Sequence, residues 1–139
     1  AVYALGESRQ SDAIKALVKT LEIEDPVSRY SAVISLGKIG KPASGILIKI
    51  MLNKKYQRAL RGQAIEELVN LKEKSAVAGF IQLLKDRDSV IRIEVLMALE
   101  KIKDRRSFES IRDASLNDNN PDIRRIAKEI YERITKGNS

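Results

Sequence analysis

The feature that most constrains this sequence is a repeat with a period of 31 or 32 residues. Four arginines serve as its anchors and are separated by 32, 31 and 32 residues: Arg29, Arg61, Arg92 and Arg124. An apolar residue stands three, seven and ten residues after each anchor, as Ala32, Leu36 and Ile39 do in the first copy. Offsets of 3, 7 and 10 trace one face of an α-helix. The sequence therefore predicts the same amphipathic helix four times.

A second set of apolar stripes lies between the anchored helices, so each period predicts a helical hairpin. We call the anchored helices A and the intervening helices B. The B stripes are Ile14, Leu17 and Leu21, then Ile48, Met51 and Leu52, then Phe80, Leu83 and Leu84, then Phe108, Ile111 and Ala114. We expect A helices at 27–38, 58–71, 88–102 and 121–135, and B helices at 10–22, 43–53, 75–85 and 105–116. All three prolines, Pro26, Pro42 and Pro121, stand at expected helix starts, where a missing N–H is tolerated.

The first full period carries a family pattern. A proline at Pro26 is followed by Arg29 and by a Leu-Gly-Lys-Ile-Gly stretch that ends at Gly40, and the segment from Asn120 to Ala127 repeats the first half. This pattern resembles HEAT repeats, and more narrowly the short HEAT-like repeats first noted in phycobilin lyases. The resemblance implies an all-α fold, a right-handed α-α superhelix (α-solenoid) of about four repeats of 31–32 residues.

The resemblance also implies a single repeat domain over residues 1–139, with repeats at about 1–25 (partial), 26–56, 57–87, 88–119 and 120–139 (partial). Residues 1–6 match the second half of an A helix, so we expect a fragment of a longer solenoid. The alternative is a natural small protein whose last helix is a polar cap. That cap would carry Lys128, Glu129, Glu132 and Arg133.

The composition argues against an enzyme. Cysteine and histidine are absent, which removes thiolate metal sites and the commonest general base, and we expect no metal and no cofactor. Known catalysts with HEAT-like folds need His-Glu motifs or a tryptophan, and this chain has neither histidine nor tryptophan. A lyase-type enzyme subunit is a second alternative that only the resemblance supports. No apolar run is long enough for a membrane span; a cytoplasmic location is favoured, and the oligomeric state is left open.

The B helices are the expected partner-binding surface, because the resemblance implies that they line the concave face. The positions expected to point outward are Lys15, Lys19, Ile46, Ile50, Ala78, Gln82, Glu109 and Asp113. Ile46 and Ile50 lie one helical turn apart, and we expect them to be exposed together as an anchor for a partner helix. The alternative is that neighbouring helices cover them. The leading hypothesis is a non-catalytic protein–protein interaction scaffold.

A basic edge supports a second functional hypothesis. The net charge is +7, and the A-to-B turns hold seven cations against Glu73 and Asp104: Lys38, Lys41, Lys72, Lys74, Lys103, Arg105 and Arg106. Such an edge could bind nucleic acid through its phosphates, without reading sequence. The alternative is a solvated edge that complements helix C-termini. The four anchor arginines are expected to form a structural ladder with carboxylates or carbonyls, and a phosphate-reading column is the alternative.

Overall fold

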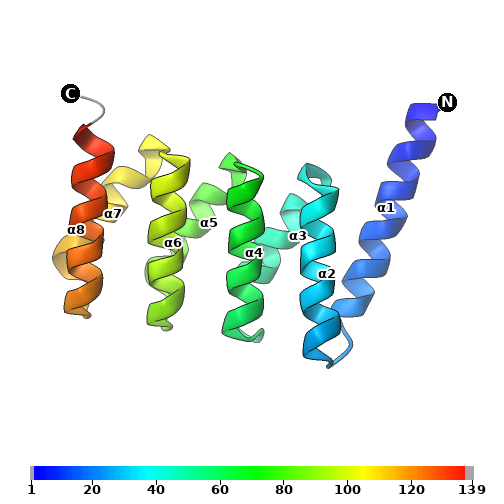
Figure 1. The fold of residues 1–139 in the computed structure, drawn as a ribbon, viewed down its shortest axis with the longest axis horizontal. Helices are drawn as coiled ribbons and strands as arrows, with labels where there is room; N and C mark the ends of the chain where they lie inside the picture. The colour runs from blue at the N-terminus through cyan, green and yellow to red at the C-terminus, as the bar shows by residue number, and fades with distance from the viewer. Residues whose placement is uncertain (1, 137–139) are drawn as a thin grey trace. The chain divides into compact units, whose positions relative to one another are not determined.

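The computed structural model describes residues 2–136, and these residues form α-helices and short 3-10 turns with no strand among them. The helices are α1 (Val2–Leu21), α2 (Pro26–Ile39), α3 (Ser44–Leu52), α4 (Arg58–Asn70), α5 (Val77–Leu83), α6 (Ser89–Ile102), α7 (Phe108–Asn117) and α8 (Pro121–Lys136). Figure 1 shows this order along the chain. The even-numbered helices are the A helices and the odd-numbered helices are the B helices. The all-helical prediction is confirmed.

The chain divides into two compact units, residues 1–71 and residues 72–139. In unit 1, α2 packs against α1, α3 and α4, and α3 packs against α4. In unit 2, α6 packs against α5 and α8, and α7 packs against α8. Neighbouring A helices therefore lie side by side within each unit (Figure 1). A single domain over residues 1–139 stays a prediction.

Local sequence explains where three of the four A helices begin, α2, α6 and α8. Pro26 occupies the first turn of α2, and the side chain of Asp25 accepts a hydrogen bond from the Ser28 backbone N–H. Asp88 caps α6 in the same way, and the Asn120 side chain accepts from the first turn of α8. Such side chains satisfy N–H groups that have no partner inside the helix.

The A-to-B turns share a backbone residue with positive φ. It falls eleven residues after the anchor arginine, at Gly40 (φ 91°), Lys72 (φ 51°) and Lys103 (φ 55°). A short 3-10 turn follows each, at Lys41–Ala43, Lys74–Ala76 and Arg105–Ser107. The Gly40 N–H donates to the Leu36 carbonyl, and the Lys103 N–H donates to the Leu99 carbonyl. These bonds close the C-terminal turns of α2 and α6.

The expected division of residues 1–22 into the end of one helix at 1–6 and a separate B helix at 10–22 is wrong, because α1 runs without a break from Val2 to Leu21. Residues 6–13 are all exposed. No packing contact therefore offsets the cost of closing a turn there, and the helix continues. Ala1 lies outside the described residues.

The core follows the predicted A stripes. The positions three and seven residues after the anchors are buried in the first three copies, as Ala32 and Leu36 are in the first. The positions ten residues after them, such as Ile39, are half-buried there. In the last copy Tyr131 is half-buried and Ile134 is buried. Burial of these aliphatic side chains is the main stabilising term of each unit.

Candidate partner-binding surfaces

The two anchor arginines of unit 1 hold B-to-A turns together. The Arg29 Nε donates to the Leu21 carbonyl at the end of α1, at 2.9 Å. The Arg61 Nε makes the equivalent bond to the Met51 carbonyl in α3, also at 2.9 Å. The Arg29 guanidinium also lies 5.5 Å from the centre of the Tyr56 ring, within the range of a cation–π contact.

The anchor arginines of unit 2 make the same kind of contact and add a carboxylate. Arg92 donates to the Asp86 carbonyl at 2.8 Å and to the two Asp118 carboxylate oxygens at 3.0 and 3.3 Å. It also donates to the Asn119 side chain at 3.1 Å. Arg124 donates to the Asp118 carbonyl. The guanidinium groups of all four anchor arginines therefore donate hydrogen bonds to other residues of the fold.

The B-helix face of unit 1 differs from its prediction in α3. Lys15 and Lys19 are exposed, Ile46 is half-buried, and Ile50 is 2% exposed. The expectation that Ile46 and Ile50 are exposed together is therefore wrong. The buried side of α3 carries Leu47, Ile50 and Met51, so the predicted stripe was out of phase. Because six of the seven residues from 46 to 52 are apolar, their spacing did not mark the inward side.

The B-helix face of unit 2 is polar and largely acidic. Gln82, Glu109 and Asp113 are all exposed, and the Asp113 carboxylate accepts a hydrogen bond from the Asn117 side chain at 2.8 Å. Leu116 stands three residues after Asp113 and is 64% exposed. Sequence reasoning missed Leu116, although it continues the Glu109–Asp113 side of the helix by one turn.

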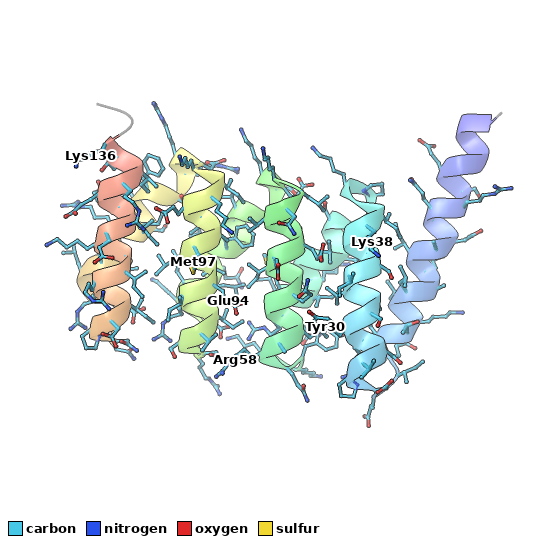
Figure 2. All side chains as sticks on the ribbon, viewed as in Figure 1. Tyr30, Lys38, Arg58, Glu94, Met97 and Lys136 are labelled. Atoms are coloured by element: carbon cyan, nitrogen blue, oxygen red, sulfur yellow. The ribbon has the colours of Figure 1, made fainter. Side chains whose placement is uncertain are left out.

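The seven cations of the basic edge are all exposed. Lys38 and Lys41 belong to unit 1, and Figure 2 labels Lys38 near the C-terminal end of α2. The other five belong to unit 2 and lie on two turns: Lys72, Lys74, Lys103, Arg105 and Arg106. Arg106 joins these two turns, because it donates to the Lys74 carbonyl at 3.1 Å and to the Asp104 carboxylate at 2.9 and 3.0 Å.

Asp104 is an internal component of this edge. Its carboxylate accepts hydrogen bonds from the side chain and the backbone N–H of Arg106, which lower the pKa of Asp104 to about 2. The nearby charges of Arg106 and Lys74 contribute to this lowering of the pKa. Glu73 caps the preceding turn by accepting from the Ser75 backbone N–H. Asp104 and Glu73 therefore both stabilise turns, and the exposed lysines give the edge its positive charge.

Unit 1 also contains a groove that sequence reasoning did not find. Its volume is about 530 Å³, and it lies where α2 and α4 begin. Its lining is mostly apolar: Glu24, Pro26, Val27, Arg29, Tyr30, Gln57, Ala59 and Leu60. Val27 is 73% exposed and Tyr30 is 43% exposed. The two walls are about 30 residues apart in the chain, so no local sequence pattern brings them together.

The part of the chain that the structure describes contains neither a metal-binding cluster nor a membrane-spanning helix. No group of three or more His, Cys, Asp or Glu side chains there could hold a metal ion. No helix among residues 2–136 is long and apolar enough to cross a membrane.

Comparison with known families agrees with the repeated hairpins and turns. A family model described as HEAT repeats matches residues 1–59 and 46–130. No curated protein matches the chain by sequence. HEAT repeats generally serve as protein-interaction scaffolds and are generally non-catalytic. The matched segments cover most of the chain, and the architecture is that of an α-solenoid. The chain belongs to the HEAT-repeat family.

Proposed function

We propose that this chain is a non-catalytic scaffold that binds a partner protein through the exposed face of its B helices. In unit 1 the surface consists of Lys15 and Lys19 of α1, with the half-buried Ile46 of α3 beside the exposed Lys49. In unit 2 it consists of Gln82 of α5 and of Glu109, Asp113 and Leu116 of α7. Ile50 is no longer part of the proposed surface, because it belongs to the core.

The observation that carries the proposal is a set of exposed polar side chains on the B helices that have no hydrogen-bond or ion-pair partner among the described residues. On the A helices, the anchor arginines, Tyr30 and Arg133 all make hydrogen bonds inside their own unit. On the B helices, the side chains of Lys15, Lys19, Gln82 and Glu109 make no hydrogen bond or ion pair with the described residues. These B-helix groups can therefore pair with a partner at no cost to internal contacts.

The charge of each face predicts what it would contact. The face of unit 1 is basic and fits an acidic stretch of the partner. The α7 surface of unit 2 has an exposed leucine beside two carboxylates, and it fits an apolar side chain flanked by lysine or arginine. The finer resemblance, to the repeats of phycobilin lyases, stays a prediction about subtype.

Site-specific photo-crosslinking in the native host tests the B-helix surface. A photoreactive amino acid replaces Lys19 or Glu109, and the matched control replaces Lys128, which is exposed on the A helix α8. We expect Lys19 and Glu109 each to give a discrete crosslinked protein, and Lys128 to give none. Charge reversal of Lys15 should then remove the crosslink formed at position 19. Crosslinking of the same partner from Lys128 alone would rule out the B-helix face.

Nucleic-acid binding through the basic edge is a second candidate. It is favoured by the clustering of five cations on two turns of unit 2 that Arg106 holds together. The test is fluorescence anisotropy of a labelled DNA duplex over a range of salt concentrations. Binding through Z phosphates should give a log–log salt slope of about −0.9Z.

The residues to reverse are Lys74 and Arg105, because Arg106 also has a structural role. Replacing both with Glu should reduce the salt slope, whereas replacing Lys85 and Lys128, which are equally exposed, should change it less. Absence of binding at low salt would eliminate this candidate.

A further inference from the structure

The groove in unit 1 combines an apolar floor with walls that are already fixed. Leu60 is 6% exposed and forms the buried part of the lining, whereas Val27 and Tyr30 remain open to solvent. The Tyr30 hydroxyl donates to the Gln63 side chain at 2.8 Å, which joins the α2 wall to α4. The contact between Arg29 and the Tyr56 ring joins α2 to the turn before α4. A preformed site loses little entropy when it binds.

The turns beside the groove carry opposite charge. The turn between α1 and α2 holds Glu22, Glu24 and Asp25 and no base, whereas the turn between α3 and α4 holds Lys54 and Lys55 and no acid. Asp25 is used as a helix cap. In the described part of the chain, no ion pair joins Lys54 or Lys55 to Glu22 or Glu24. A ligand that spans both turns would therefore meet unneutralised negative charge at the turn between α1 and α2 and unneutralised positive charge at the turn between α3 and α4.

We propose that this groove binds a short linear segment of a partner protein in which one large apolar side chain separates an acidic stretch from a basic stretch. The apolar side chain would pack on Val27, Tyr30 and Leu60. The acidic stretch would lie toward Lys54 and Lys55, and the basic stretch toward Glu24. The volume of about 530 Å³ suits one such side chain with its flanking backbone. This site is separate from the B-helix surface and does not rest on it.

The geometry also determines which variants leave the fold intact. Val27 is 73% exposed in the first turn of α2, so replacing it removes little core packing. An aspartate there is compatible with the helix N-terminus, where negative charge is favourable. Met97, which is 51% exposed on α6, supplies a matched apolar-to-acidic control in unit 2. Figure 2 labels both Met97 and Tyr30.

The probe is the labelled peptide Asp-Glu-Ser-Ser-Phe-Ser-Lys-Lys, titrated into the whole chain. Binding is followed by fluorescence anisotropy and by the amide resonances of Val27, Tyr30 and Leu60. Two peptides with the same central Phe, one with only acidic flanks and one with only basic flanks, test the charge requirement. We expect the dipolar peptide to shift these three resonances and to bind about tenfold more tightly than either control peptide.

Replacing Val27 with Asp or with Ser should weaken binding about tenfold or more, as removal of a central apolar contact does. The Ser variant separates loss of the apolar contact from the added charge. Lys54→Glu with Lys55→Glu should remove the preference for the dipolar peptide, and Met97→Asp should change nothing.

Three results would overturn the proposal: no binding of the dipolar peptide at about 1 mM, equal binding of all three peptides, or equal binding to the Val27 variants. Because the crosslinking positions Lys19 and Glu109 do not line the groove, failure here and failure of the B-helix surface are distinguishable.

Discussion

Arg29 in unit 1 and Arg92 in unit 2 occupy the same position of the repeat, yet they are held in different ways. Arg92 is followed after 26 and 27 residues by Asp118 and Asn119, and its guanidinium binds both side chains. The same offsets from Arg29 give Lys55 and Tyr56. Because Lys55 cannot form an ion pair with an arginine, the Tyr56 ring is the only one of these two side chains that contacts the Arg29 guanidinium. The same anchor position therefore contributes a different free energy to the stability of each unit.

The side-chain contacts between neighbouring A helices also differ between the two units. In unit 1 the link is between Tyr30 and Gln63, and the Gln63 amide in turn donates to Glu67 at 2.9 Å. Gly37 is buried next to the Glu67 carboxylate, and a Cβ at that position would overlap it. In unit 2 the link is an ion pair between Arg133 and Glu100, with the shorter contact at 2.6 Å. The contact between A helices should therefore respond more strongly to salt in unit 2.

The largest effect should come from the anchor arginines. Arg92→Ala leaves the Asp118 carboxylate, which is 5% exposed, without its cation. Stranding a buried charge costs about 3–5 kcal/mol. Arg29→Ala removes one carbonyl hydrogen bond and one cation–π contact, at a cost of about 1–2 kcal/mol. Urea unfolding followed by circular dichroism measures both changes, and hydrogen exchange assigns each change to its unit. Equal destabilisation by the two substitutions would contradict the comparison.

The next effect concerns Gly40, whose backbone (φ 91°, ψ −143°) only glycine adopts without strain. Gly40→Ala should destabilise unit 1 by about 1–3 kcal/mol. Gly45→Ala is the control: Gly45 lies inside α3 with open space around its Cα, so alanine should stabilise the helix by up to about 1 kcal/mol. Thermal unfolding of the two variants should move in opposite directions, and a shift in the same direction would refute the strain argument.

The equivalent turn of unit 2 should show a smaller effect of opposite sign. Lys103 lies in the left-handed region (φ 55°, ψ 39°), which costs a non-glycine residue about 1 kcal/mol. Lys103→Gly should therefore stabilise unit 2 by about 0.5–1 kcal/mol. Lys101→Gly, within α6, should destabilise it by about 1 kcal/mol. Both values come from urea unfolding, and destabilisation by Lys103→Gly would show that its side chain has another role.

The smallest effect should be the pH dependence that Asp104 contributes. Because its folded pKa is lowered to about 2 from an ordinary 3.8, its ionised form stabilises the fold above pH 3.8. That contribution is lost as the pH falls through about 2. Asp104→Asn keeps a capping side chain and removes the charge. The difference in unfolding free energy from the parent chain should shrink as the pH falls. A difference that does not change with pH would contradict this role of Asp104.

The accuracy of the sequence predictions follows from which interactions are local. The A helices are correct to within one or two residues, because proline, capping side chains and an apolar spacing of 3.6 residues act within a single helix. The division of residues 1–22 into two helices and the phase of α3 were wrong for a related reason. In both segments the deciding factor is what packs against the helix, as the exposure of residues 6–13 and the burial of Ile50 show.

The sequence by itself determined the repeated hairpin, its period, the buried Leu36, Leu68 and Leu99, and the cations of the A-to-B turns. Only the tertiary structure decided how each anchor arginine is held and where unit 1 opens a groove. Arg92 reaches a side chain 26 residues away, and Tyr30 reaches one 33 residues away. Contacts at such separations depend on how helices pack, and the periodicity of one helix holds no information about the side chains that a distant helix places against it.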